Sequence, residues 1–331
     1  MPVVKGPGFA PVFLRMAEPT PAPAGSASTL PPGPGKGLIF LRRLGSTVVL
    51  WACVLGALFA GPGLMADGLF LAVMLLIAVL GLIEFYALVE KAGLGCFGRT
   101  GILGGVLLVV DTFWFARSHE AAAATPVMPT DFEVAVLILF VLGLFLRQFW
   151  SQQPGSGIVR ISTTLLGLLY VPWLLGFIQK LHFFPDVNGV NVDGNYYVLY
   201  FILVTKFSDL GAYVTGSLIG RHKMIPRISP GKTWEGFAGA IVISTGVSVA
   251  FAHFLQPKLY GMTLMHAVIL GVLLSLAAVV GDLIESIFKR EAKVKDSGSF
   301  FPGIGGILDL MDSLLFNAPL MYLYLRHIIA N

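Results

Sequence analysis

The stretch of sequence that decides the fold covers residues 293–313 and reads KVKDSGSFFPGIGGILDLMDS. It leads directly into LLFNAPLMYLYL, so the chain after the Gly-Gly pair is apolar enough to form a membrane span. Two carboxylates, those of Asp309 and Asp312, fall in the first turns of this span. A carboxylate within a membrane is costly unless a positive group meets it. The stretch therefore predicts a membrane protein with a cation close to these two side chains.

The composition of the whole chain agrees with a membrane protein. Of its 331 residues, 56% are hydrophobic and only 12% are charged, and the mean hydropathy is +0.83. A soluble domain carries about 25% charged residues, roughly twice this fraction. The two cysteines, Cys53 and Cys96, lie in or beside apolar runs, so we expect neither a disulfide framework nor a metal site from them.

Apolar segments long enough to cross a bilayer recur along the chain. A spanning helix needs about 20 mostly apolar residues. The pattern predicts an all-α polytopic integral membrane protein with about nine transmembrane helices and no soluble domain or internal repeat. The predicted spans cover residues 40–60, 65–90, 100–117, 133–150, 160–181, 195–219, 234–256, 263–288 and 306–326. We expect no nucleic-acid partner.

The chain divides into three regions. Residues 1–36 are rich in Pro, Ala and Gly and are typical of a disordered tail. A secretory signal that ends in AGPGLMA is the alternative, although its basic region would be about twice the usual length. Residues 37–190 hold about five transmembrane helices, and residues 191–331 form a C-terminal transmembrane region that carries most of the polar motifs.

The distribution of basic residues predicts how the chain crosses the membrane. Cytoplasmic loops carry an excess of Lys and Arg. With the N-terminus in the cytoplasm, most of the 22 Lys and Arg residues fall on that side, including two clusters at residues 221–233 and 289–295. The N-terminus is therefore expected in the cytoplasm and the C-terminus on the opposite side. Topology alone, or contact with anionic lipid headgroups, would also account for such clusters.

Acidic side chains near these basic clusters indicate a cation site. Asp282 and Glu285 are three residues apart at the end of the eighth predicted span, so they share one helix face. Asp309 and Asp312 have the same spacing at a similar depth in the ninth span. Four carboxylates at one level repel each other unless a cation lies among them, and Mg²⁺ binds carboxylates together with water and phosphate oxygens. The alternative is a structural set of hydrogen bonds or ion pairs with basic residues of the 289–295 cluster.

Loops beside the carboxylates offer donors for a phosphate. Before the ninth span, Gly305 and Gly306 follow Pro302 and allow the backbone to approach a ligand closely. The segment SPGKTWEG, residues 229–236, supplies a cation and hydroxyl groups where the seventh span begins. It is not a P-loop, because Pro226 occupies the position of the first glycine that a P-loop requires.

The sixth predicted span contains two more charged residues. Lys206 and Asp209 are three residues apart and can neutralise each other. Gly211, Gly216 and Gly220 follow them, and small residues of this kind favour close packing of membrane helices.

Two ordered motifs give the chain a family resemblance. The segments SDLGAYVTGSLIGRHKMIPRISPGKTWEG and GDLIESIFKREAKVKDSGSFFPGIGGILDLMDS resemble the phosphatidate cytidylyltransferase (CDP-diacylglycerol synthase) family, over about residues 205–316. The residues that match the family signature in register are Ser286, Lys289, Arg290, Lys295, Asp296, Gly298, Pro302, Gly305, Gly306, Asp309 and Asp312. Two positions depart from it, since Ile304 stands where the family has His and Leu310 where it has Arg.

The resemblance implies a reaction. The family condenses CTP with phosphatidic acid from the bilayer, which yields CDP-diacylglycerol and pyrophosphate in phospholipid biosynthesis. It uses Mg²⁺, with a second, monovalent cation such as K⁺ nearby, and it favours a homodimer. The implied location is the bacterial inner membrane, with the active site facing the cytoplasm and residues 191–331 as the catalytic region.

The resemblance also implies roles for individual residues. Asp282 and Asp309 are expected to bind the metal, with Asp312, Glu285 and Asp296 in support. Lys232, Lys289, Arg290 and Lys295 are expected to hold nucleotide or lipid phosphates. The remaining members of the expected substrate site are Ser229 and Thr233, as hydrogen-bond donors, together with Asp209, Gly305 and Gly306. The group expected to act in catalysis consists of Asp282, Asp309, Lys289, Arg290 and Lys232.

Two alternative functions remain open. An ion-coupled transporter also uses paired carboxylates in broken helices, although it would more often show inverted repeats and carry its acids at the middle of the bilayer. A divergent relative with altered substrate or lost activity is the other alternative, because Ile304 and Leu310 replace polar residues near the expected metal. The polar residues Glu84, Asp111 and His182 are expected only to hydrogen-bond within the helix bundle.

Overall fold

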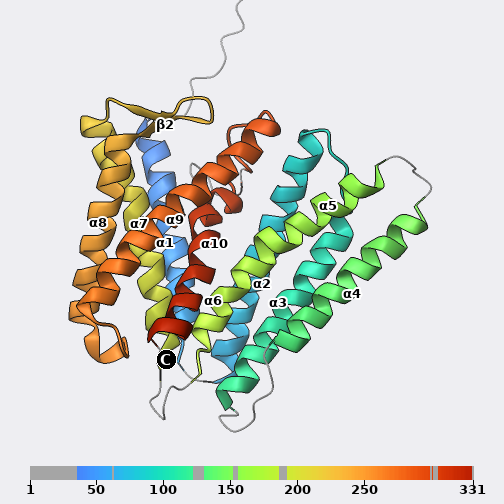
Figure 1. The fold of residues 1–331 in the computed structure, drawn as a ribbon, viewed down its shortest axis with the longest axis horizontal. Helices are drawn as coiled ribbons and strands as arrows, with labels where there is room; N and C mark the ends of the chain where they lie inside the picture. The colour runs from blue at the N-terminus through green and yellow to red at the C-terminus, as the bar shows by residue number, and fades with distance from the viewer. Residues whose placement is uncertain are drawn as a thin grey trace, which may run out of the picture.

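The structure is a computed structural model that describes residues 36–61, 63–121, 130–151, 156–185, 192–298, 300 and 305–329. Long helices make up nearly all of it (Figure 1). The predicted tail lies outside the described residues except for Lys36, where the first helix begins. Pro302 and Ile304 lie outside them as well.

Ten α-helices are labelled in the described part of the chain. Their bounds are α1 (Lys36–Phe59), α2 (Leu64–Lys91), α3 (Gly98–Ala121), α4 (Thr130–Phe149), α5 (Gly157–Leu168), α6 (Leu174–His182), α7 (Gly194–Ile219), α8 (Trp234–Phe254), α9 (Leu264–Glu291) and α10 (Ile307–Tyr324). A π-helical turn, Leu169–Trp173, joins α5 to α6 and contains Pro172. Because proline has no N–H and disturbs the regular α-helical bonding, a wider turn at this position is expected.

Seven segments in the described part of the chain are long and apolar enough to cross a membrane. They are Leu64–Lys91, Gly98–Ser118, Phe132–Phe149, Gly157–His182, Gly194–Ile219, Trp234–Phe254 and Leu264–Glu291. The chain is therefore an all-α integral membrane protein, as predicted. The two other predicted spans are helical, as α1 and α10, but do not belong to this set, so the count of nine stays a prediction.

One apolar core joins the first and second halves of the chain. Leu82 of α2 and Leu175 of α6 are fully buried in the same cluster as Phe201 of α7, Leu274 of α9 and Leu315 of α10. The C-terminal helices therefore do not stand as a separate unit, and side chains from the N-terminal half can reach them.

Glycines allow the C-terminal helices to pack closely. A Cβ atom at Gly211 of α7 would lie 3.0 Å from the carbonyl oxygen of Gly239 on α8. A Cβ atom at Gly281 of α9 would lie 2.6 Å from the carbonyl oxygen of Asp312 on α10. The close packing predicted at Gly211 is confirmed, and the contact at Gly281 brings the two acid-bearing helices together.

A short antiparallel hairpin interrupts the helices between α7 and α8. Its strands are β1 (Lys223–Ile225) and β2 (Ser229–Thr233), and Lys223 lies opposite Thr233. The hairpin covers one end of the helix bundle (Figure 1). The guanidinium of Arg290 on α9 donates a hydrogen bond of 3.1 Å to the carbonyl of Ile228 in the hairpin turn, which ties the hairpin to α9.

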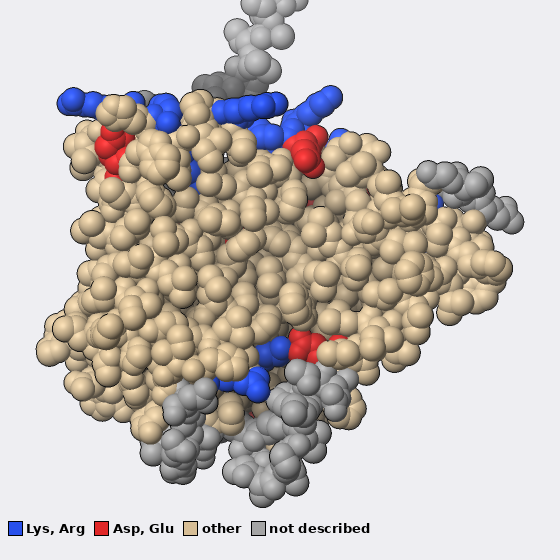
Figure 2. Space-filling model, in the orientation of Figure 1, with Lys and Arg blue, Asp and Glu red and all other residues tan. Residues whose placement is uncertain are grey.

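Basic side chains gather at the end of the molecule that carries the hairpin. Figure 2 shows Lys and Arg concentrated there, with a smaller group at the opposite end. The exposed basic residues of the two clusters are Arg221, Lys223, Arg227, Arg290, Lys293 and Lys295. The polar end of the protein is thus distinct from the apolar sides of its helices.

Candidate active site

A cavity of about 580 Å³ lies beneath the hairpin, between α7, α8, α9 and α10. The residues from the sequence prediction that line it are Asp209, Ser229, Lys232, Thr233, Asp282, Lys289, Asp309 and Asp312. Three regions far apart in the sequence therefore meet at one cavity, as the two motifs predicted.

Three carboxylates form a compact cluster at this cavity. One oxygen from each of Asp282, Glu285 and Asp312 lies within 4.8 Å of the others. Asp282 and Glu285 come from one face of α9, and Asp312 comes from α10 across the close contact at Gly281. The i, i+3 spacing predicted the shared face of α9, and the glycine contact brings α10 to it.

Glu285 is the most deeply buried member of this cluster. Glu285 is 0% exposed, and neither of its carboxylate oxygens has a hydrogen-bond partner among the described residues. Lys289 lies 3.2 Å from Oε2 and is its ion-pair partner. Buried polar groups in native proteins nearly always have partners, so Oε1, which has none among the described residues, is the clearest sign of a ligand at this position.

Two lysines form ion pairs with the carboxylates. The ammonium of Lys289 lies 2.7 Å from Oδ1 of Asp309 as well as beside Glu285. The ammonium of Lys232, from the hairpin, lies 2.7 Å from Oδ2 of Asp282. Both lysines line the cavity, so their charges are within reach of an anion that enters it.

Negative charge exceeds positive charge around the cavity. The carboxylates are those of Asp209, Asp282, Glu285, Asp309 and Asp312, and the ammonium groups are those of Lys206, Lys232 and Lys289. With all of them ionised, two negative charges have no counterpart in this set. A divalent cation would balance them, because it favours the charged form of nearby carboxylates.

The cluster of Asp282, Glu285 and Asp312 fits a hard cation. Oxygen is the ligand that Mg²⁺ prefers, at about 2.1 Å, so two oxygens on one ion lie at most about 4.2 Å apart. The oxygens of the three carboxylates lie within 4.8 Å of one another, so small movements would bring them to the separation that one Mg²⁺ ion requires. Together with Oε1 of Glu285, which has neither a hydrogen-bond partner nor an ion-pair partner among the described residues, this makes the three residues a suitable magnesium site.

Asp309 has a different environment from the one expected for a metal ligand. Its Oδ1 meets Lys289, and its Oδ2 accepts hydrogen bonds from the Ser297 N–H at 3.0 Å, the Ser297 hydroxyl at 2.9 Å and the Gly306 N–H at 2.8 Å. These bonds fix the start of α10. The predicted role of Asp309 as a direct metal ligand stays a prediction.

The pair Lys206 and Asp209 forms as predicted and also contacts α10. The ammonium of Lys206 lies 3.3 Å from Asp209 and donates a hydrogen bond of 2.9 Å to the carbonyl of Leu310. The hydroxyl of Ser313 donates to Asp209 at 3.2 Å. This network joins α7 to the first turn of α10, next to the carboxylate cluster.

Other predicted site residues differ in how closely they approach the cavity. Thr233 lies at the start of α8, where its hydroxyl accepts a hydrogen bond from the Gly236 N–H at 3.1 Å. Arg290, Lys295 and Asp296 are exposed and are not among the residues that line the cavity. Their expected contacts with phosphate therefore stay predictions.

The expectation that Glu84 hydrogen-bonds within the helix bundle is confirmed, but the sequence did not identify its partners at the start of α10. Its carboxylate, from α2, accepts hydrogen bonds from the backbone N–H groups of Ile307 and Leu308 at 3.0 and 2.9 Å. It also lies 3.0 Å from the hydroxyl of Ser297. An acid in a predicted span was the available signal, but its partner lies more than 200 residues away, so the sequence alone could not identify it.

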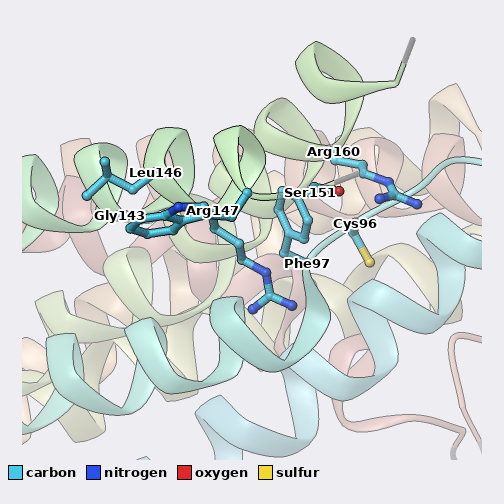
Figure 3. Close-up of a pocket in the computed structure, with 8 residues that line it drawn as sticks. Cys96, Phe97, Gly143, Leu146, Arg147, Ser151 and Arg160 are labelled. Carbon is cyan, nitrogen blue, oxygen red and sulfur yellow. The ribbon is translucent and has the colours of Figure 1, made fainter. Parts of the chain in front are cut away.

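A second cavity, of about 780 Å³, lies between the α2–α3 loop, α4 and α5 (Figure 3). The guanidinium groups of Arg147 and Arg160 lie 4.7 and 5.7 Å from the centre of the Phe97 ring. The described residues that line it include no Asp or Glu, so they offer no carboxylate for a hard cation. The carboxylate-lined cavity is therefore the candidate active site.

Comparison with known proteins assigns the chain to a family. A family model described as "Cytidylyltransferase family" matches residues 41–328. Phosphatidate cytidylyltransferase of Bacillus subtilis (strain 168) is 30% identical over 253 residues, which make up 76% of this chain and 87% of that protein. The corresponding proteins of Staphylococcus haemolyticus and Haemophilus influenzae are 43% identical over 133 residues and 35% identical over 175 residues. These matches cover 40% and 52% of this chain and 50% and 58% of the two relatives. The extent of the family match and of the Bacillus subtilis alignment shows that this chain belongs to the cytidylyltransferase family.

Proposed function

We propose that this chain is a CTP:phosphatidate cytidylyltransferase. Its membership of the family, together with the cavity lined by carboxylates and lysines, supports this proposal. A phosphate oxygen of phosphatidic acid attacks the α-phosphorus of CTP. The new P–O bond yields CDP-diacylglycerol, and the bond to the β-phosphate breaks to release pyrophosphate. Both substrates are polyanions, so the enzyme must neutralise and align them.

The two lysines at the cavity perform the neutralisation in this proposal. Lys232 and Lys289 each lie against a carboxylate, Asp282 and Asp309 respectively, at 2.7 Å. A phosphate group that enters the cavity competes with these carboxylates for the ammonium groups, and charge-assisted hydrogen bonds then hold it. Because Lys232 comes from the hairpin and Lys289 from α9, the two can contact different phosphates and keep the reacting groups in line.

Magnesium is part of the proposal. Asp282, Glu285 and Asp312 would hold the ion, and Asp309 stays a predicted ligand beside them. Bound there, Mg²⁺ would neutralise phosphate charge and stabilise the leaving pyrophosphate. A second, monovalent cation such as K⁺ is proposed from the family resemblance.

The location of the active site follows from charge. The cavity opens near the hairpin, where exposed Lys and Arg gather, and basic residues favour the cytoplasmic side of a membrane (Figure 2). We therefore propose a cytoplasmic active site and N-terminus, in the inner membrane of a bacterium. The acyl chains of phosphatidic acid can stay in the bilayer while its headgroup enters the cavity. A homodimer is proposed from the resemblance and is testable by light scattering in detergent.

The alternatives to this activity receive less support. Family membership does not favour an ion-coupled transporter. Of the two departures from the family signature, Leu310 lines an apolar cavity of about 370 Å³ together with Trp51 and Val54. Its side chain thus packs among apolar residues, whereas its carbonyl accepts a hydrogen bond from Lys206. An altered substrate preference remains a proposal for the product assay to resolve.

The test is pyrophosphate release by purified protein in detergent with CTP, phosphatidic acid and Mg²⁺. We expect release to require both the lipid and the metal and to collapse in Asp282→Asn. A matched control is Asp67→Asn, which removes a carboxylate that pairs with Arg117 at 2.9 Å on other helices. Absence of turnover by folded wild-type protein would contradict the proposed function.

A further inference from the structure

The side chain of Glu84 connects the N-terminal half of the chain to the start of α10. Its Oε1 accepts the Ile307 N–H at 3.0 Å, and its Oε2 accepts the Leu308 N–H at 2.9 Å. The first N–H groups of a helix have no partner within the helix, and a carboxylate there also interacts favourably with the helix dipole. Glu84 therefore supplies from α2 the cap that α10 does not obtain from Gly306, which has no side chain.

Two glycines leave the space that this carboxylate occupies. A Cβ atom at Gly298 would collide with Oε1 of Glu84, and a Cβ atom at Gly306 would collide with Oε2 and with the hydroxyl of Ser297. The backbone at Gly298 and at Gly306 therefore packs directly against the Glu84 carboxylate. This is a specific arrangement, because any other residue at either glycine would displace the carboxylate.

Ser297 links Glu84 to a residue of the candidate active site. Its hydroxyl oxygen lies 3.0 Å from Oε2 of Glu84 and 2.9 Å from Oδ2 of Asp309. The backbone N–H of Asp309 donates to the same hydroxyl at 3.3 Å. Asp309 in turn binds Lys289, and Asp312 lies less than one helical turn further along α10. A shift at Glu84 would therefore move two carboxylates at the cavity.

We propose that Glu84 is a positioning residue for cytidylyl transfer, which holds the start of α10 so that Asp309 and Asp312 face Asp282 and Glu285. Glu84 does not line the cavity, so it acts through Ser297 and the α10 backbone and does not touch substrate. This inference rests on the proposed function, because it assigns Glu84 a part in that reaction. It also predicts that the metal site depends on Glu84.

The test compares Glu84→Gln with wild type in steady-state assays and in Mg²⁺ titrations. The amide cannot accept from both backbone N–H groups, since its NH₂ would face one of them. We expect kcat to fall by about 10- to 100-fold, the effect of losing one charge-assisted hydrogen bond, with KM for CTP nearly unchanged. The Mg²⁺ concentration for half-maximal activity should rise. Glu84→Asp keeps the charge but is shorter, so it should recover part of kcat.

The matched control is Glu133→Gln in the same half of the chain. Glu133 also accepts two side-chain hydrogen bonds, from Trp173 at 2.6 Å and Lys180 at 2.5 Å, but among the described residues it makes no hydrogen bond to the start of α10. We expect this variant to keep the wild-type kcat. A wild-type kcat and Mg²⁺ requirement in Glu84→Gln, or equal losses in both glutamine variants, would overturn the proposal.

A readout without turnover separates this inference from the proposed function. Mg²⁺ alone should raise the melting temperature of wild-type protein, and Glu84→Gln should reduce this shift at the same Mg²⁺ concentration. If Glu84→Gln does not fold, Ser297→Ala provides a second test, because this variant keeps Glu84. It should also reduce the Mg²⁺-dependent rise in melting temperature. Failure of the wild type to transfer cytidylyl groups would contradict the function, whereas an unchanged Mg²⁺ shift in these variants would contradict the role of Glu84.

Discussion

Substitution of Glu285 by Gln tests whether the buried carboxylates form a metal site or only an ion-pair network. Glu285 is fully buried, its oxygens have no hydrogen-bond partner in the described structure, and Lys289 is its ion-pair partner at 3.2 Å. The amide has nearly the same shape, so the substitution removes the charge and leaves the packing intact.

The expected loss of metal affinity is large. A single negative charge about 4 Å from a divalent ion contributes on the order of 8 kcal/mol at an effective dielectric constant of about 20, before desolvation offsets part of it. Changes to groups that merely support a metal ligand already cost about 10- to 100-fold in affinity. We therefore expect Glu285→Gln to raise the Mg²⁺ concentration for half-maximal activity by about 100-fold or more.

The expected loss of stability is small. Breaking a buried ion pair typically costs about 3–5 kcal/mol, because an uncompensated charge remains. In this site Lys289 keeps Asp309 at 2.7 Å, so it does not become unpaired. We expect the melting temperature without Mg²⁺ to stay near the wild-type value or to rise.

Pyrophosphate release and thermal melts, each titrated with Mg²⁺, measure the two effects. The Mg²⁺-dependent rise in melting temperature should be present in wild type and nearly absent in Glu285→Gln. A glutamine variant that keeps both the wild-type Mg²⁺ requirement and the wild-type thermal shift would refute the metal site. A variant that is merely unstable in the absence of Mg²⁺ would indicate a structural ion pair.

Three further substitutions test neighbouring parts of the account. Lys232→Met should raise KM for CTP or for phosphatidic acid by about 10- to 100-fold, since one charge-assisted phosphate contact is lost. Initial rates over a range of each substrate would show it, and unchanged KM values for both would remove Lys232 from the phosphate site. Thr233→Ala should cost about 1 kcal/mol of stability, because the Gly236 N–H loses the hydroxyl that caps α8. Thr233→Ser keeps a hydroxyl and should not be destabilised, and equal melting temperatures of the two variants would contradict the cap. Asn317→Leu should destabilise the bundle by about 1–3 kcal/mol, because the buried Thr205 hydroxyl loses its donor at 2.6 Å, and equal melting temperatures would contradict that bond.

The sequence predicted the parts of the site that follow from local spacing. The i, i+3 pair of Asp282 and Glu285 lies on one face of α9, and Asp312 joins it across the close contact between α9 and α10. Lys232 lines the same cavity, and its expected contact with phosphate stays a prediction. These outcomes depend only on helical periodicity and on the order of residues in two long motifs.

Contacts between distant segments could not be predicted in this way. Glu84 lies in an apolar span with no motif around it, and its partners are backbone N–H groups, which leave no trace in residue types. The ion pair of Lys289 with Asp309 joins α9 to α10 between residues 20 positions apart, and helical spacing does not predict it. The structure places Glu285 in a cluster with Asp282 and Asp312, whereas Asp309 pairs with Lys289, and metal binding by any of these residues stays a prediction.

Cytidylyl transfer is tested most directly by following the α-phosphorus of CTP. Purified protein would receive phosphatidic acid, Mg²⁺ and CTP carrying a radioactive label at either the α- or the γ-phosphate, and the products would be separated into lipid and water phases. The account predicts that the α-label appears in the lipid phase as CDP-diacylglycerol while the γ-label stays in water as pyrophosphate. Transfer of the γ-label to lipid, or no label in lipid with folded protein, would contradict it.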